Sequence, residues 1–184
     1  MNQEKIAILV ERSKQRDATA FRQLVENCQP FVFRIAFRLL CDDDEAKDVV
    51  QETFIKVWLH LDKYKNDVRF STWLYKIACN LCYDRLRVLQ RISETEVDID
   101  ISELNVADDN NMEQSFINED LRKYIVTLTR GLPPRQRLVF TLRDIEDLEL
   151  NEVEKITGMS RAKIKSNLYL ARQYVRERIM NYEI

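Results

Sequence analysis

Glycine and proline are scarce in this sequence of 184 residues, which contains only 2 Gly and 3 Pro. So few turn residues argue against a β-sandwich or barrel, and also against the glycine-rich loops that bind nucleotide phosphates. No apolar run reaches the ~18 residues that a membrane-spanning helix needs, and the N-terminus has no signal-peptide pattern. We therefore expect a globular, cytoplasmic, all-α protein.

Histidine occurs once, at His60, and cysteine four times, at Cys28, Cys41, Cys79 and Cys82. The last two cysteines have the spacing of a metal or redox pair, but no second close pair accompanies them. We interpret all four as reduced, small apolar residues of helices. The sequence also offers no nucleophile–base pair and no metal-ligand cluster. We expect no catalytic residues, no metal and no cofactor, and therefore no enzyme.

The net charge of −2 conceals an uneven distribution of charge along the chain. Residues 92–120 hold ten acidic residues and no basic one, whereas residues 1–91 have a net charge of +3 and residues 121–184 a net charge of +5. Two basic blocks therefore flank an acidic segment. This pattern predicts one domain over 1–91, a flexible acidic linker over 92–114 and a second domain over 115–184.

Helical periodicity runs through both predicted domains. It predicts helices over 3–14, 17–40, 44–61, 71–90, 112–130, 134–146, 149–156 and 160–180. Pro30 is expected to kink or break the second of these helices, and Asp42 to Asp44 to cap the start of the third. Gly131 is expected to cap the C-terminus of the helix before it.

Two faces of the helix over 44–61 carry different chemistry. One face is apolar and suits a core. The other mixes acids and an amide with large aliphatic side chains: Asp44, Asp48, Gln51, Glu52, Ile55 and Leu59. A merely solvated face would seldom carry both Ile55 and Leu59. Periodicity alone leaves two interpretations open, a docking surface for a basic, partly apolar partner or a face that another helix of the same domain covers.

The helix over 70–90 carries a polar stripe opposite its apolar face. The stripe and the loop before it contain Lys63, Tyr64, Lys65, Asn66, Arg69, Thr72, Trp73, Lys76, Asn80, Tyr83, Asp84 and Arg87. Cations can hold phosphates, rings can stack on unpaired bases, and amides can read base edges. The pattern favours binding of single-stranded nucleic acid. A solvated polar face with aromatic rings tucked into the core is the alternative.

The C-terminal block has the strongest local pattern. A short helix with Val153 and Ile156 ends at the glycine-containing turn 157–159, and Ser160 can cap the next helix. Residues 155–178 carry seven basic side chains against one acidic side chain. This is typical of a helix-turn-helix whose second helix enters the major groove of duplex DNA. An ordinary helical hairpin with a basic surface is the alternative.

Three stretches resemble conserved regions of bacterial sigma-70-type factors. DDDEAKDVVQETFIKVW (42–58) resembles region 2.2, FSTWLYKIACNLCYDRLR (70–87) resembles regions 2.3 and 2.4, and residues 132–179 resemble region 4. The order of these stretches, with no other region present, resembles the extracytoplasmic-function (ECF) group. The resemblance implies two small helical domains, regions 2 and 4, that bind core RNA polymerase and direct it to promoters.

The resemblance also implies roles for individual residues. Docking on the clamp coiled coil of the largest polymerase subunit is implied for Asp48, Gln51, Glu52 and Ile55. Recognition and opening of the −10 element is implied for Tyr64, Lys65, Asn66, Arg69, Trp73, Lys76, Asn80, Tyr83, Asp84 and Arg87. Recognition of the −35 duplex is implied for Arg143, Lys165, Ser166, Tyr169 and Arg172. From the basic start of the same helix we also expect −35 contacts by Ser160, Arg161 and Lys163.

The recognition helix departs from the family pattern at Asn167 and Leu170, where arginines are common. We therefore expect a weaker −35 contact or a different preferred sequence, with Arg161 and Lys163 as compensating charges. The family further implies an anti-sigma factor as a partner, and we expect a monomer in the free state. Two rival functions are a helix-turn-helix regulator that acts without polymerase and an adaptor that binds only protein. Whether the two domains pack together without polymerase is left open.

Overall fold

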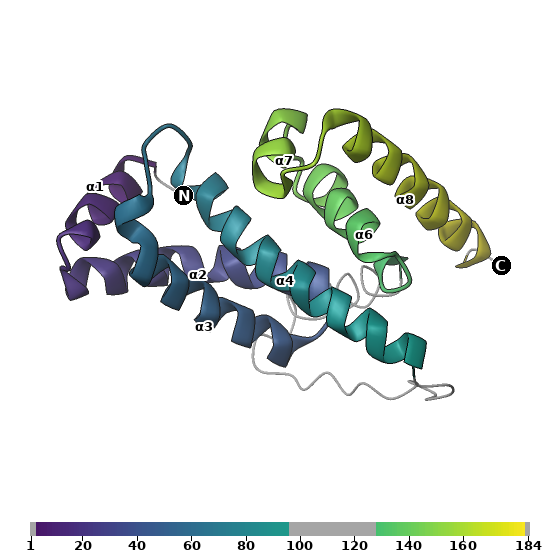
Figure 1. The fold of residues 1–184 in the computed structure, drawn as a ribbon, viewed down its shortest axis with the longest axis horizontal. Helices are drawn as coiled ribbons and strands as arrows, with labels where there is room; N and C mark the ends of the chain where they lie inside the picture. Colours follow the sequence, from purple (N-terminus) through teal and green to yellow (C-terminus); the bar gives the residue numbers. More distant parts are fainter. Residues whose placement is uncertain (1–2, 96–127, 183–184) are drawn as a thin grey trace, which may run out of the picture.

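The structure, a computed structural model, describes residues 3–95 and 128–182. Every regular element in these ranges is helical, and the helices form two groups (Figure 1). The N-terminal group comprises α1 (Gln3–Lys14), α2 (Ala18–Leu40), α3 (Asp43–His60), the 3-10 turn η1 (Leu61–Lys63) and α4 (Phe70–Thr95). The C-terminal group comprises α6 (Pro134–Phe140), the π turn η2 (Thr141–Ile145), α7 (Leu150–Thr157) and α8 (Arg161–Tyr182). The all-α prediction is confirmed.

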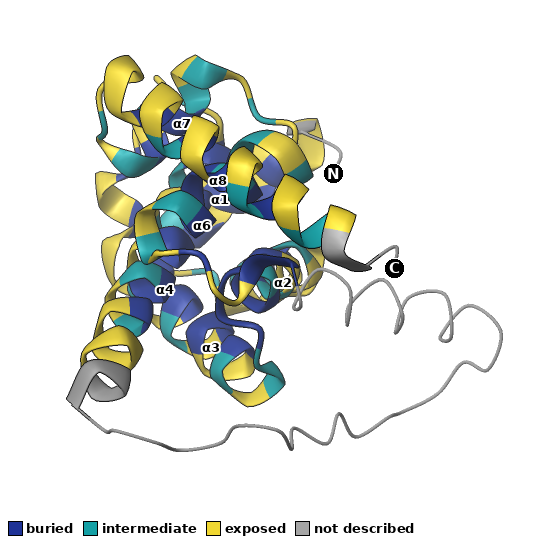
Figure 2. Cartoon of the chain, turned by 90° about the vertical axis from the view of Figure 1, so that its right-hand side faces the viewer, coloured by how far each residue is buried: buried dark blue, intermediate teal, exposed yellow. Residues whose placement is uncertain are grey.

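Helix α2 is the centre of the N-terminal group and contacts α1, α3 and α4. Its fully buried side chains include Leu24, Val32, Ile35 and Leu39, and Figure 2 shows buried positions where α2, α3 and α4 face one another. Pro30 lies inside α2 and does not end it. A proline inside a helix costs about 3 kcal/mol, and the apolar side chains buried on both sides of Pro30 offset that cost.

Several helix ends follow local sequence signals, and the prediction for Gly131 does not hold. Asp42 caps α3 as predicted, because its carboxylate accepts a 2.9 Å hydrogen bond from the backbone N–H of Glu45. Gly158 ends α7 in the left-handed conformation, with φ of 68°. Gly131 does not adopt that conformation. A Cβ at Gly131 would lie 1.9 Å from the hydroxyl of Tyr174. Glycine is therefore needed here because the Tyr174 side chain packs against the backbone, and not because the helix ends in a left-handed turn.

Two helix boundaries differ from those that the sequence predicts. α4 continues to Thr95, beyond the predicted domain end at residue 91, since no glycine or proline follows to stop it. The helix predicted over 134–146 is α-helical only to Phe140 and continues as the π turn η2. The predicted linker from residue 96 onward, and the helix predicted over 112–130 up to residue 127, lie outside the described residues.

The two groups of helices pack directly against each other. α4 contacts both α6 and α7, and α2 contacts η2 (Figure 1). One buried apolar cluster contains Leu39 and Leu74 of the N-terminal group together with Leu142 and Ile156 of the C-terminal group. The structure therefore holds the chain in a closed arrangement, which answers the question that the sequence left open.

All four cysteines are buried as thiols. Burial raises the pKa of Cys28 to about 11 and that of Cys82 to about 12, so both thiols stay protonated at neutral pH. The cysteines thus serve as apolar packing residues, and no metal-ligand cluster occurs among the residues that the structure describes. None of the described helices has the length and apolarity needed to cross a membrane.

We expect the thiols of the native protein to resist labelling by an aromatic disulfide reagent at pH 8. Raising a thiol pKa from about 8.5 to about 11 lowers its thiolate fraction by about 100-fold or more, and burial adds a steric barrier. Absorbance of the released thiolate, followed with and without denaturant, measures this. Rapid labelling of Cys79 and Cys82 in the native protein would contradict their role as packing residues.

Candidate polymerase and nucleic-acid interfaces

Helix α3 presents its mixed stripe to solvent. Asp48, Gln51 and Ile55 are exposed, and Glu52 is half-buried. Ile55 and Leu59 are 59% and 56% exposed, although burying such a side chain is worth about 1.5–3 kcal/mol. No described element covers this stripe. The interpretation in which another helix of the domain covers it therefore fails for the part of the chain that the structure describes.

Glu52 differs from its neighbours on the stripe because two cations hold its carboxylate. Its Oε1 lies 3.2 Å from Nζ of Lys56, and its Oε2 lies 3.5 Å from Nη2 of Arg85 on α4. Arg85 also pairs with Glu45 and so ties α3 to α4. Asp48 has no ion-pair partner within the described ranges, and its charge is available to another molecule.

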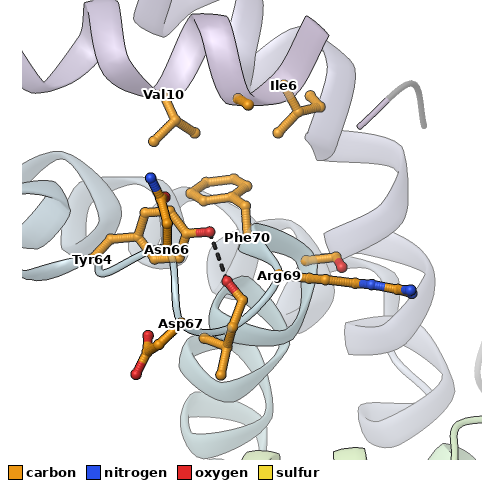
Figure 3. A pocket seen from close by; sticks show the side chains of 10 residues that line it. Ile6, Val10, Tyr64, Asn66, Asp67, Arg69 and Phe70 are labelled. Atoms are coloured by element: carbon orange, nitrogen blue, oxygen red, sulfur yellow. Dashed lines mark hydrogen bonds between the residues drawn. The ribbon is translucent and has the colours of Figure 1, made fainter. Parts of the chain in front are cut away.

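A pocket of about 390 Å³ lies between α1 and the loop that leads into α4 (Figure 3). Its walls are apolar side chains of α1, the loop 64–69 and the first residues of α4. In Figure 3, Ile6 and Val10 face the ring of Phe70, while Arg69 extends away from them. This volume is within the range of about 300–1,000 Å³ that is usual for small-ligand sites. The sequence prediction includes Tyr64, Asn66 and Arg69 of this lining but misses the side chains of α1, because only tertiary packing brings α1 to the loop.

The buried side chain of Tyr64 holds the loop 64–69 in its conformation. Its side chain is only 7% exposed, although the sequence placed it among the DNA contacts. Its hydroxyl donates a 2.8 Å hydrogen bond to the carbonyl oxygen of Val68. Its ring packs edge-on against Phe70, with centroids 5.4 Å apart. The loop closed in this way leaves Lys65 and Asn66 exposed.

The polar face of α4 continues from this loop. Its exposed residues, each about one turn from the next, are Lys76, Asn80, Asp84 and Arg87. Trp73 and Tyr83 are half-buried beside them, and the guanidinium carbon of Arg87 lies 5.9 Å from the centroid of the Tyr83 ring. Cations, one amide and half-buried aromatic rings therefore share one side of α4, and such groups can bind an unpaired nucleic-acid strand.

Helix α8 presents its basic face to solvent. The exposed side chains on this helix include Arg161, Lys163, Lys165, Ser166, Tyr169 and Arg172. Ser160 lies at the start of α8, where its hydroxyl accepts a long hydrogen bond, 3.5 Å, from the backbone N–H of Lys163. Tyr169 is 70% exposed. Lys163 and Lys165 have no acidic partner among the described residues, so their charges can meet phosphates.

Three arginines predicted to contact the −35 duplex are engaged inside the C-terminal group. The guanidinium of Arg172 donates two hydrogen bonds, of 2.7 and 2.8 Å, to the carboxylate of Asp144. Arg161 donates a 2.7 Å hydrogen bond to Glu154. The Arg172 and Arg161 side chains remain 56% and 65% exposed, so both can still reach a phosphate. Arg143 instead donates to a backbone carbonyl in the loop before α7 and helps to shape it.

Comparison with known proteins assigns these surfaces to a family. Sigma-70 region 2 matches residues 24–92, and Sigma-70 region 4 matches residues 122–175. The ECF RNA polymerase sigma-E factor of Escherichia coli (strain K12) is 31% identical over 179 residues, which cover 94% of this chain and 93% of that protein. The chain belongs to the ECF RNA polymerase sigma factors. The stripe on α3 and the face of α4 thus lie in region 2 of this sigma factor, and α8 begins in region 4.

Two solved structures share the fold of this sigma factor. CnrH, solved in complex with the cytosolic domain of CnrY, has a TM-score of 0.67 and 21% identity over 96% of this chain and 98% of its own. The sigma factor RpoE of Bartonella quintana, solved with the anti-sigma factor NepR, has a TM-score of 0.63 and 24% identity over 85% of this chain and 94% of its own.

Proposed function

We propose that this sigma factor binds core RNA polymerase through the stripe on α3 and directs it to promoters with both domains. Region 2 reads and opens the −10 element, and region 4 reads the −35 duplex. One observation carries the proposal: a single chain exposes an acidic and aliphatic stripe, an aromatic and basic face with a pocket, and a basic recognition helix. A regulator acting without polymerase needs only the last surface, and a protein adaptor needs neither nucleic-acid surface.

The two nucleic-acid surfaces suit different forms of DNA. On α4, Lys76 and Asn80 are exposed beside half-buried rings, which favours an unpaired strand whose bases stack. The pocket between α1 and the loop 64–69 can receive a base that has left the duplex. On α8, Lys165 and Tyr169 occur one turn apart on an exposed helix face, which suits insertion into a major groove.

The −35 contact relies on fewer charges than is usual in the family. The amide of Asn167 donates a 2.8 Å hydrogen bond to the carbonyl oxygen of Lys163 on its own helix. Leu170 is 44% exposed and adds no charge. Lys163 and Lys165 therefore supply most of the unpaired positive charge at the start of α8, and we expect a −35 affinity that depends on these two lysines.

Run-off transcription with purified core RNA polymerase on candidate promoters tests the proposal. We expect promoter-specific transcripts only when this protein is added. Duplex binding without transcripts would favour the regulator that acts alone, and neither activity would favour the protein adaptor. The chain contributes no catalytic step in this proposal, since the polymerase carries the chemistry.

We also propose that an anti-sigma factor binds this protein. The support is the solved complex of RpoE from Bartonella quintana with NepR, which shares the fold. The exposed aliphatic side chains of Ile55 and Leu59 offer such a partner the apolar contacts that a stable interface needs. A partner on this stripe would compete directly with core RNA polymerase.

A further inference from the structure

The closed arrangement places the carboxylate of Glu146 in a basic site on region 2. Glu146 follows the π turn η2 in region 4, and its side chain is only 6% exposed. One carboxylate oxygen pairs with Arg38 on α2. The other accepts a 2.7 Å hydrogen bond from the hydroxyl of Tyr75 on α4 and lies 3.6 Å from Nη2 of Arg34. All these partners come from region 2, so the acid joins the two domains.

Further polar contacts link the domains. The buried guanidinium of Arg137 on α6 donates a 2.9 Å hydrogen bond to the carbonyl oxygen of Leu39 at the C-terminus of α2, where a helix has carbonyls without partners of their own. Arg135 donates a 3.1 Å hydrogen bond to the hydroxyl of Tyr83. Region 4 thus engages a ring that belongs to the proposed −10 surface.

In the closed arrangement, α7 also borders that surface. Lys155 of α7 lines the same cleft of about 410 Å³ as Lys63, Lys65 and Lys76 of region 2. Thr72 in the same cleft is only 8% exposed. The four lysines that line this cleft repel one another, and Asp67 is the one acidic residue of its lining. The closed arrangement therefore needs attractions elsewhere that outweigh this repulsion. The apolar cluster shared by the two groups, the hydrogen bonds of Arg137 and Arg135, and the contacts of Glu146 supply them.

The distance between promoter elements sets a limit that the closed arrangement does not meet. Elements at −10 and −35 lie about 25 base pairs apart, which is about 85 Å along a duplex at 3.4 Å per base pair. A compact body of the 148 described residues, 93 in the first range and 55 in the second, has a radius of gyration of about 15 Å and is about 40 Å across. The 32 residues between Thr95 and Leu128 permit a separation of up to about 110 Å. Both elements can therefore be occupied together only after the domains part.

We propose that Glu146 locks this sigma factor in a self-inhibited closed state, and that Arg34, Arg38 and Tyr75 form the socket from which it must leave before both promoter elements are bound. The proposal rests on the proposed function for its consequence but not for the lock itself. A buried ion pair suits a reversible lock. Its charges regain water on opening, whereas removing one partner leaves an unpaired buried charge.

The lock is tested by single-molecule energy transfer in the free full-length chain. Dyes are placed at Arg22→Cys on α2 and Gln173→Cys on α8, both exposed positions, while the native cysteines are buried. We expect high transfer for the parent chain. Arg38→Glu or Glu146→Arg should shift the population toward low transfer by about 100-fold. The charge swap that carries both changes should restore part of the transfer, because the glutamate at position 38 can pair with the arginine at position 146 while Arg34 still repels that arginine.

Controls separate the lock from general effects. Glu177→Arg makes the same charge change as Glu146→Arg at an exposed site on α8, and it should leave energy transfer unchanged. Glu146→Gln keeps the shape of the side chain and is the substitute variant if either charge-reversed protein does not fold. It should also lower energy transfer. Unchanged transfer in all Glu146 variants that fold would overturn the lock.

Promoter-complex formation with core RNA polymerase tests the inhibition. We expect Glu146→Arg to form complexes several-fold faster than the parent chain, and Glu177→Arg to match the parent. An opened variant with no gain in rate would overturn self-inhibition. If the variants open but neither they nor the parent chain yield any transcript, the proposed function fails while the lock stands.

Discussion

Replacing Ile55 with glutamate should sharply reduce promoter-specific transcription, because it should weaken the binding of core RNA polymerase. Ile55 is 59% exposed at the centre of the α3 stripe, with Leu59 on the next turn. Exposed aliphatic side chains next to acids fit a partner that is both apolar and basic. An anchor of this kind typically contributes 2 kcal/mol or more to an interface, so we expect the dissociation constant to rise by about 30-fold or more.

The matched control is Ile8→Glu on α1. Ile8 is also 59% exposed, so the same substitution there changes hydropathy and charge without touching the stripe. Titration of labelled core RNA polymerase measures affinity, and thermal unfolding checks that both variants fold. Equal losses in the two variants, or full affinity in Ile55→Glu, would show that the docking surface is misassigned.

Charge reversal on the same stripe is best made at Asp48. Asp48→Arg should weaken the complex with core RNA polymerase and leave the fold intact, since Asp48 is exposed. Glu52 is a poorer choice, although the family resemblance gives it the same role. Its carboxylate neighbours Lys56 and Arg85, so an arginine there would place like charges together and destabilise the contact between α3 and α4.

Local patterns in the sequence predict the helices and the exposed stripe well. The alternation of apolar and polar residues in α3 depends only on helix geometry, and Ile55 and Leu59 are indeed exposed. The turn around Gly158 and the cap at Asp42 are equally local, since each needs only its neighbours in the chain. The family resemblance then gives these surfaces a function that periodicity alone leaves open.

Local sequence patterns cannot predict features that depend on packing between segments far apart in the chain. In the sequence, Tyr64 resembles an exposed aromatic residue that contacts DNA. It is buried because its hydroxyl donates a hydrogen bond to the carbonyl oxygen of Val68 and its ring packs against Phe70. Arg137 resembles one more surface cation of a basic domain, yet it is 6% exposed and donates to the end of α2. Glu146 gives no signal at all, since its partners in α2 and α4 are about 70 to 110 positions away in the sequence.

The closed arrangement leaves some surfaces of the sigma factor exposed and restricts others. The stripe on α3 and the basic face of α8 are exposed, whereas α7 and Arg135 border the −10 surface of α4. Core RNA polymerase can therefore meet the docking stripe before the domains part. We expect docking to precede opening of the chain, and recognition of the −10 element to follow it.

Replacing Asn80 and Lys76 with alanine should slow promoter opening by about 10- to 100-fold while duplex binding by region 4 stays unchanged. Both side chains are exposed on α4 beside Trp73 and Tyr83. Hydrogen bonds that involve a charged group, such as those of Lys76 or Asn80 to a phosphate, are worth about 1.5–3 kcal/mol each, whereas duplex recognition depends on α8. A fluorescent base analogue in the −10 element reports opening, and anisotropy of a −35 duplex reports region 4 binding.

The two residues must also be tested singly, because Lys76 has a second effect. Lys76 lines the lysine cleft together with Lys155, so Lys76→Ala relieves repulsion between the domains in the closed state. This change can slow promoter opening indirectly, because the domains then stay together longer. Asn80→Ala changes no charge and isolates the contact with the unpaired strand. Asn27→Ala, at an exposed amide on α2, should leave both rates unaltered. If Asn80→Ala weakens opening and duplex binding equally, α4 does not read the unpaired strand.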